Sequence, residues 1–181
     1  ADDSRVYLFD STLRDGAQTQ GVDFSVADKV AIARALDNLG IDYIEGGWPG
    51  ANPTDDAFFR EPLELSRAKF TAFGMTRRPG RSVENDPGLA ALFDVEPAAV
   101  CMVGKTWDYH VDVALNIPRE ENVEMISDSV AYAKHNNFYY IPGEDFKVPD
   151  WQNGYQPLDG EEVKNADHNF IESPAKWTGN G

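Results

Sequence analysis

Charged and polar side chains follow four short apolar runs of this sequence, and their types suit the binding of a small anion. They are Arg14, Asp15 and Gln18 after the first run, Glu45 at the end of the second, Thr76, Arg77 and Arg78 after the third, and Lys105 after the fourth. Arginine and lysine side chains bind carboxylates and phosphates through charge-assisted hydrogen bonds. Cations gathered in an otherwise acidic protein therefore indicate a small anionic substrate that is steered to this place.

Each of these residues also has a purely structural interpretation. Arginine and lysine in surface loops are often solvated charges that contribute little. Asp15 could pair with Arg14 or cap the following turn. Glu45 is the better candidate, because a carboxylate that ends an apolar strand is costly to bury without a partner, although a paired structural glutamate is the alternative. Cys101 lies inside an apolar run and is interpreted as a small core residue.

The elements that must position these side chains alternate between strand-like and helix-like patterns as far as about residue 135, which is typical of βα units around a parallel sheet. Strands are predicted at 5–9, 41–45, 70–75 and 99–103. Helices are predicted at 26–39, 55–59, 61–68, 87–93 and 118–135, the last with Val123, Ile126, Val130 and Ala133 as its buried stripe. In such folds the active site lies at the carboxyl ends of the strands, where the polar residues above occur.

The length limits the architecture. A (β/α)₈ barrel needs roughly 250 residues, whereas this chain has 181. The predicted fold is therefore α/β, a partial (β/α)₈ TIM barrel of about four βα units over residues 1–135. Residues 136–181 show neither the helix nor the strand pattern of apolar residues and are predicted to form an irregular acidic tail, with a degenerate fifth strand at 138–146.

Composition and charge exclude several classes of protein. The formal charge of −15 repels nucleic acids and anionic lipids. No apolar run approaches the roughly 18 residues of a membrane span, and the amino-terminal residues are polar. A single cysteine fits a reducing compartment. We therefore expect a cytoplasmic protein with no nucleic-acid or membrane partner.

Four motifs in the expected order resemble one enzyme family. Residues 9–18 (FDSTLRDGAQ) resemble the signature of the acyl-CoA condensing and cleaving barrels, which include isopropylmalate, homocitrate and citramalate synthases and hydroxymethylglutaryl-CoA (HMG-CoA) lyase. Residues 44–55 (IEGGWPGANPTD), 73–78 (FGMTRR) and 104–108 (GKTWD) are most similar to the citramalate synthase branch.

The resemblance implies an acyltransferase that condenses acetyl-CoA with pyruvate, a 2-oxo acid, to citramalate in branched-chain amino-acid (isoleucine and leucine) biosynthesis. It also implies a divalent cation, Mg²⁺, Mn²⁺ or Zn²⁺, that polarises the ketone. By the same resemblance Asp15 is a metal ligand, Arg14 and Glu45 are catalytic, and Gln18 binds substrate. Thr76, Arg78 and Lys105 are assigned to substrate binding from their position after the predicted strands.

The sequence departs from the family at the metal site. Members supply two further ligands from a His-x-His pair, whereas the three histidines here, His110, His135 and His168, are not so spaced. The metal site is therefore expected to be incomplete and the isolated chain inactive.

The open sheet edges of a half-barrel predict a homodimer or pairing with a missing carboxyl-terminal half. The alternative functions are a 2-isopropylmalate synthase, an HMG-CoA lyase-like enzyme, and a non-enzymatic half-barrel that binds a 2-oxo acid or a partner subunit, with its tail over the exposed edge.

Overall fold

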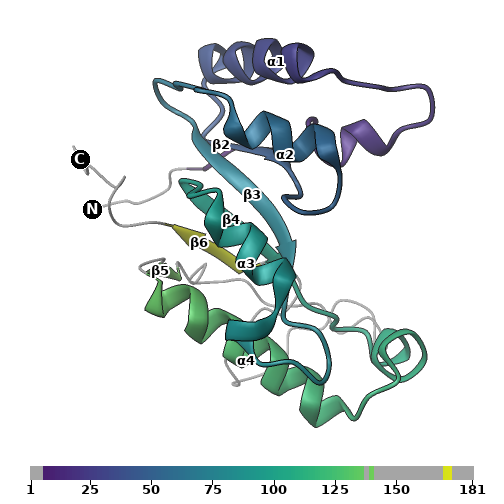
Figure 1. Cartoon of the computed structure of the whole chain (residues 1–181). Helices are drawn as coiled ribbons and strands as arrows, with labels where there is room; N and C mark the ends of the chain where they lie inside the picture. Colours follow the sequence, from purple (N-terminus) through teal and green to yellow (C-terminus); the bar gives the residue numbers. More distant parts are fainter. Residues whose placement is uncertain (1–5, 137–138, 141–168, 173–181) are drawn as a thin grey trace.

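A computed structural model describes residues 6–136, 139–140 and 169–172, which build one sheet with helices packed on it (Figure 1). Four strands are parallel and neighbour one another in chain order: β1 (Phe9–Asp10), β2 (Tyr43–Gly47), β3 (Lys69–Met75) and β4 (Ala99–Val103). Beyond β4 the sheet continues with β6 (Asn169–Glu172) and then β5 (Tyr139–Tyr140), both joined by antiparallel pairing.

A helix follows each parallel strand. The helices are α1 (Val26–Leu39), α2 (Pro53–Arg60), α3 (Pro87–Asp94) and α4 (Arg119–His135), with short helical turns η1 (Gly16–Gln18), η2 (Val83–Asn85) and η3 (His110–Leu115) in the loops. Helices α1 and α2 lie together beside the start of the sheet, α4 lies at its other end, and α3 lies between them (Figure 1). The predicted series of four βα units is therefore confirmed.

Local sequence explains where the helices begin and end. Ser25 and Asp28 form a reciprocal capping box at the start of α1. Gly40 ends that helix with a φ of 97°, a left-handed conformation that glycine adopts without steric cost. Helices α2 and α3 each begin with a proline, preceded by the capping side chains of Asn52 and Asp86.

The core lies between the sheet and the helices in two clusters. One gathers Leu13, Ala33, Ile44 and Phe58, and the other Ala72, Leu89, Leu92, Val100, Met102 and Ala133. Because side chains alternate along a strand, the residues between these strand positions, including Glu45, Phe73 and Cys101, point to the opposite face of the sheet. That face carries the candidate site.

Two sequence predictions about helices are wrong. Residues 61–68 form no helix, because the chain leaves α2 at Glu61 in an extended conformation. Val123 is 65% exposed, so it does not belong to the buried stripe of α4. Polar Asn122 and Ser129 are buried on that helix instead. They are hydrogen-bonded to the loops after β4 and β3, so loop anchoring rather than apolar packing explains their burial.

The segment after α4 contributes two strands to the described sheet. β5 lies inside the range predicted for a fifth strand, and the other residues of 138–146 lie outside the described residues. The neighbour of β4 is β6, which runs antiparallel to it, with Ala99 opposite Glu172 and Met102 opposite Asn169. A barrel that continued its own pattern would place a parallel strand there. Within the described residues, no helix is both long and apolar enough to cross a membrane.

Asp37 holds the connection between α2 and β3 against α1. Its buried carboxylate accepts hydrogen bonds from the backbone N–H groups of Ser66, Arg67 and Ala68, at 2.8, 2.9 and 2.7 Å, and from the Ser66 hydroxyl at 2.7 Å. Burial by itself raises the pKa of Asp37, but these donors outweigh it and lower the pKa from 3.8 to about 2.

This shift predicts that part of the folding stability disappears in acid. A depressed native pKa contributes stability above the unfolded-state pKa, and the contribution, about 2 kcal/mol, is lost as the pH falls from about 4 towards about 2. Urea unfolding of the wild type and of Asp37→Asn between about pH 6 and about pH 3 measures it. The variant is expected to be less stable at neutral pH, with a smaller loss in acid. An equally steep pH dependence in both proteins would contradict this assignment.

Candidate active site

Arg14, in the loop after β1, forms an ion pair with Glu45. The sequence placed Glu45 at the end of its strand, whereas β2 continues for two residues beyond it, to Gly47. The Arg14 Nε donates to Glu45 Oε2 at 2.8 Å, and the Glu45 side chain has no exposed surface. The Arg14 side chain keeps 17% of its surface exposed. A buried carboxylate that holds a guanidinium at an open surface fixes a cation where a small anion can reach it.

The loop after β1 has a conformation that aims Arg14 at the sheet. The Ser11 carbonyl accepts hydrogen bonds from the backbone N–H groups of Arg14, Asp15 and Gly16, at 3.1, 2.8 and 3.1 Å. Asp10 caps this turn by accepting from the Thr12 backbone and hydroxyl. The turn therefore places two adjacent residues of opposite charge directly at the end of the strand.

The guanidinium of Arg14 packs on an aromatic ring, which a second ring contacts in turn. The Arg14 Cζ lies 4.0 Å from the centre of the Phe73 ring, a distance that allows a cation–π contact. Trp48 packs edge-to-face against the same ring, with 5.2 Å between centroids. Apolar surroundings lower the local dielectric and strengthen the field of a fixed cation.

Cys101 lies in register with Phe73 on the neighbouring strand and is buried. Burial, and then the negative charge of Glu45, raise the pKa of the Cys101 thiol to about 12. The thiol is therefore protonated at neutral pH and is no nucleophile. The interpretation of Cys101 as a small core residue agrees with this environment.

Asp15 differs from Glu45 in its exposure. Its side chain is 63% exposed, and its Oδ1 lies 3.3 Å from Arg14 Nη1. The carboxylate is therefore accessible to a cation from solvent. Within the described residues, however, no group of three or more His, Cys, Asp or Glu side chains could hold a metal ion. A divalent cation of the Mg²⁺ type takes about six ligands, so the described residues do not form a complete metal site.

The predicted substrate-binding residues lie at the same end of the sheet but are less closely connected. Gln18 is exposed in η1. Thr76 is buried after β3, where its N–H donates to the Val103 carbonyl at 3.2 Å. Arg78 is exposed, and Lys105 is partly buried after β4. Within the described part of the chain, no hydrogen bond or ion pair joins these four side chains to Arg14 or Asp15.

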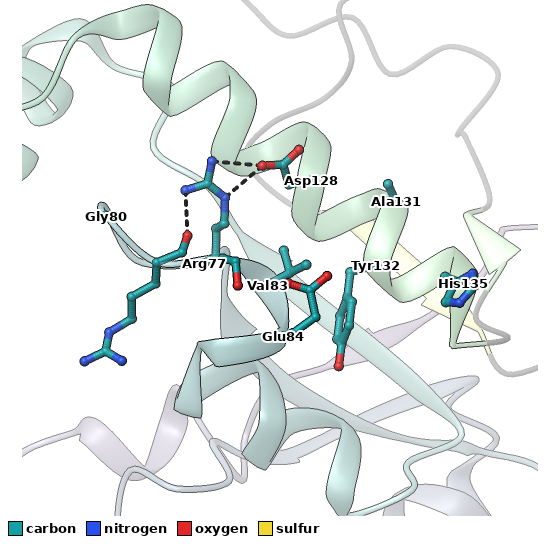
Figure 2. Close-up of a pocket in the computed structure, with 10 residues that line it drawn as sticks. Arg77, Gly80, Val83, Glu84, Asp128, Ala131, Tyr132 and His135 are labelled. Carbon is teal, nitrogen blue, oxygen red and sulfur yellow. Dashed lines mark hydrogen bonds and ion pairs between the residues drawn. The ribbon is translucent and has the colours of Figure 1, made fainter.

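Arg77 is not available to a substrate at the strand ends, although the sequence pattern grouped it with the other cations. Its guanidinium contacts Asp128 of α4 through Nε and Nη2, both at 2.9 Å, and the Arg81 carbonyl through Nη1 at 3.1 Å. Figure 2 shows this arrangement in a pocket between the β3–α3 loop and α4. The Arg77 N–H also donates to the Ser129 hydroxyl at 2.9 Å. Arg77 therefore tethers the loop to α4.

Sequence reasoning missed four residues that surround the Arg14–Glu45 pair. Phe73 and Trp48 are the aromatic support, and Lys29 and Asp55 are buried charges that lie behind it. A signal for Lys29 was present, because it stands between Val26 and Ala33 on the apolar face of α1. A lysine in that position requires a buried partner.

Comparisons with known proteins identify relatives of this chain. The (R)-citramalate synthase of Geobacter sulfurreducens is 51% identical over 135 residues, which cover 74% of this chain and 26% of that protein. The (R)-citramalate synthase of Aquifex aeolicus is 46% identical over 154 residues, which cover 84% of this chain and 28% of that protein. A 2-isopropylmalate synthase of Sulfurisphaera tokodaii is 33% identical, over 72% of this chain and 32% of that protein.

A solved structure supports the fold. The HMG-CoA lyase of Bacillus subtilis superposes with a TM-score of 0.56 at 17% identity, over 74% of this chain and 44% of that chain. The expected partial barrel is thereby confirmed as a fold. The chain spans little more than a quarter of the length of the citramalate synthases it matches. The family model described as HMGL-like matches residues 5–147, and the chain therefore belongs to the HMGL-like family.

Proposed function

We propose that this chain is the amino-terminal part of an acyltransferase of the citramalate synthase type, which condenses acetyl-CoA with pyruvate in branched-chain amino-acid biosynthesis in the cytoplasm. The observation that carries the proposal is the Arg14–Glu45 pair at the strand ends, with exposed Asp15 beside it. It occurs in a chain that is 44–51% identical to five citramalate synthases and 33–35% identical to three 2-isopropylmalate synthases.

The reaction places negative charge on one oxygen atom. A proton leaves the methyl group of acetyl-CoA, and this carbon forms a bond to the ketone carbon of pyruvate while the ketone electron pair moves to oxygen. That oxygen is then protonated, and hydrolysis of the thioester releases CoA. A fixed cation beside the ketone oxygen stabilises the charge as it develops.

Arg14 is the residue we assign to this oxygen. Its Nε–H is held by Glu45, and its Nη1 faces Asp15. The remaining N–H groups of the guanidinium are suited to the oxyanion. Glu45 belongs to the same machinery, because its buried carboxylate orients the guanidinium before substrate arrives. Such preorganisation avoids reorientation of polar groups during the reaction.

Asp15 is assigned as one ligand of a divalent cation, Mg²⁺, Mn²⁺ or Zn²⁺, which would polarise the ketone of a bound 2-oxo acid. Its exposed carboxylate suits such a hard cation. Further ligands have to come from outside the described residues or from another polypeptide. No step assigned above to Arg14 or Glu45 depends on the metal.

The other predicted residues are proposed to contact the substrates. Gln18 and Thr76 are polar groups near the 2-oxo acid, and the cations Arg78 and Lys105 suit its carboxylate or the phosphates of acetyl-CoA. Their position after β1, β3 and β4 supports this assignment. Arg77 is left out because Asp128 and the Arg81 carbonyl already hold its guanidinium.

A second candidate is a non-enzymatic half-barrel that binds a 2-oxo acid. The pairing of β6 along β4 favours it, because this strand covers the edge at which a further βα unit would continue the sheet. In either case we propose that the opposite edge, at β1, meets a second copy of the chain or a carboxyl-terminal half.

Activity is expected only when the barrel is complete. The isolated chain is expected to release little CoA from acetyl-CoA in the presence of pyruvate and Mn²⁺. A chimaera in which this chain replaces the matching segment of the Geobacter sulfurreducens synthase is expected to release CoA in a pyruvate-dependent reaction that EDTA abolishes. Arg14→Lys in the chimaera is expected to reduce kcat about 100-fold, because it removes the planar donor from the oxyanion.

Arg34→Lys is the matched control, since Arg34 is exposed on α1. A folded chimaera that releases no CoA would contradict the catalytic proposal and favour the binding half-barrel. Faster reaction with 2-oxoisovalerate than with pyruvate would instead support a 2-isopropylmalate synthase. Cleavage of HMG-CoA without condensation would support a lyase.

Metal binding tests Asp15 independently of catalysis. Electron paramagnetic resonance of Mn²⁺ mixed with the chimaera, which contains the rest of the barrel, and with pyruvate reports the bound fraction. Asp15→Asn is expected to weaken binding at least about tenfold, because an anionic ligand is lost. Asp23→Asn removes an equal charge from the exposed loop before α1 and is expected to have no effect. Equal affinities of wild type and Asp15→Asn, or no binding by the wild type, would remove Asp15 from the ligands.

A further inference from the structure

A buried lysine lies directly behind the Arg14–Glu45 pair. Lys29 of α1 is 3% exposed. Its ammonium donates to the Leu13 carbonyl at 2.8 Å, to the Gly46 carbonyl at 3.0 Å and to Asp55 Oδ1 at 2.5 Å. An ammonium has three N–H donors, so these three acceptors use all of them. Its position is therefore fixed by three different elements of the fold.

Two of these acceptors belong to the peptide units next to the candidate catalytic side chains. The Leu13 carbonyl is bonded to the backbone nitrogen of Arg14, and Gly46 follows Glu45 in β2. Lys29 therefore connects the loop after β1 to the end of β2, one residue away from the ion pair. A shift of either segment would change the distance between the guanidinium and the carboxylate.

Asp55 extends this connection to the aromatic support of Arg14. Its second oxygen, Oδ2, accepts from the Trp48 N–H at 2.8 Å and from the Asn52 amide at 2.9 Å. The Trp48 ring packs on Phe73, whose face lies under the Arg14 guanidinium. The Lys29–Asp55 pair thus reaches Arg14 through the backbone of its own loop and also through these two rings.

The two glycines after Glu45 leave room for different neighbours, Gly47 for Asp55 and Gly46 for Phe70. A Cβ atom on Gly47 would lie 2.5 Å from Asp55 Cγ, and one on Gly46 would lie 2.3 Å from the Phe70 ring. Gly47 also has a φ of 154°, which other residues rarely adopt. Gly47 therefore permits the Asp55 carboxylate to lie against the end of β2.

We propose that Lys29 is a positioning residue, which with Asp55 holds Arg14 and Glu45 at their working distance. The link to catalysis rests on the proposed function, whereas the effect on the ion pair does not. Buried ion pairs are weak contributors to net stability compared with apolar packing, so stability alone is a poor explanation for this pair. Fixed geometry between two loops is what the three hydrogen bonds of Lys29 provide.

Nuclear magnetic resonance of the Arg14 side chain tests the proposal on the chain itself. The hydrogen bond from the Arg14 Nε–H to Glu45 is expected to protect this proton from solvent exchange. Lys29→Met keeps the length of the side chain and removes the ammonium. It is expected to speed exchange of this proton about tenfold or more, as expected for local opening of a hydrogen bond.

Asp37→Asn is the matched control, because Asp37 is the other charged residue of α1 that is buried, and it contacts residues 66–68 instead. It is expected to leave Arg14 exchange unchanged. Unchanged Arg14 exchange in Lys29→Met, or equally fast exchange in Asp37→Asn, would overturn the proposal.

A double variant separates positioning from stability. Lys29→Met with Asp55→Leu removes both buried charges and is expected to regain much of the urea resistance lost in Lys29→Met. The Arg14 Nε–H is expected to exchange as fast as in the single variant, because the carbonyls of Leu13 and Gly46 still lack their donor. Recovery of Arg14 protection in the double variant would overturn the proposal. This variant also provides the test if Lys29→Met does not fold.

Kinetics of the chimaera test the positioning role independently of the exchange measurements. Lys29→Met is expected to lower kcat about tenfold while KM for pyruvate changes little, because misplacement of a catalytic group affects the transition state more than binding. An unchanged kcat in a turning-over chimaera would overturn the positioning role. If no chimaera turns over, the proposed function fails, and the exchange measurements still decide whether Lys29 positions the pair.

Discussion

The buried charge of Glu45 is the constraint on which the rest of the site depends. A carboxylate without exposed surface inside a buried strand requires a partner at hydrogen-bond distance, and Arg14 supplies it at 2.8 Å. To reach this place, the chain has to turn sharply after β1, which the Ser11 carbonyl and the Asp10 cap achieve. The position of the loop therefore follows from the need to pair one buried acid.

Other carboxylates fix loops by accepting hydrogen bonds from backbone N–H groups. Asp37 accepts from the N–H groups before β3, Asp86 from the Arg78 N–H and the start of α3, and Asp55 from the Trp48 N–H. The formal charge of the chain is −15, and some of its acidic side chains have a structural role. They accept hydrogen bonds from loop N–H groups that lack a backbone partner. Charge-assisted hydrogen bonds therefore hold these loops together with apolar contacts such as those of Leu13 and Trp48.

The sequence was sufficient to predict the βα alternation, which follows from local periodicity. The rule that strand ends carry the site singled out Arg14 and Glu45 separately, but nothing in the sequence indicated that they pair with each other. The sequence was also insufficient for Arg77, whose partner Asp128 lies 51 residues away. Neither residue has a local signal of pairing. The prediction that Val123 is buried was wrong for a related reason. Asn122 and Ser129 bind distant loops, so these polar residues of α4 face inward and Val123 faces solvent.

The two edges of the sheet differ in a way that bears on the incomplete metal site. The β4 edge is paired with β6, whereas β1 ends the described sheet, and the residues at and before it are apolar and exposed: Val6 by 78%, Tyr7 by 58% and Leu8 by 51%. These apolar residues precede β1, whereas Asp15, whose carboxylate is exposed, follows it. A polypeptide that covered the β1 edge would gain apolar burial, and we propose that the same polypeptide supplies the metal ligands that Asp15 lacks. On this proposal one contact completes both the sheet and the ligand set.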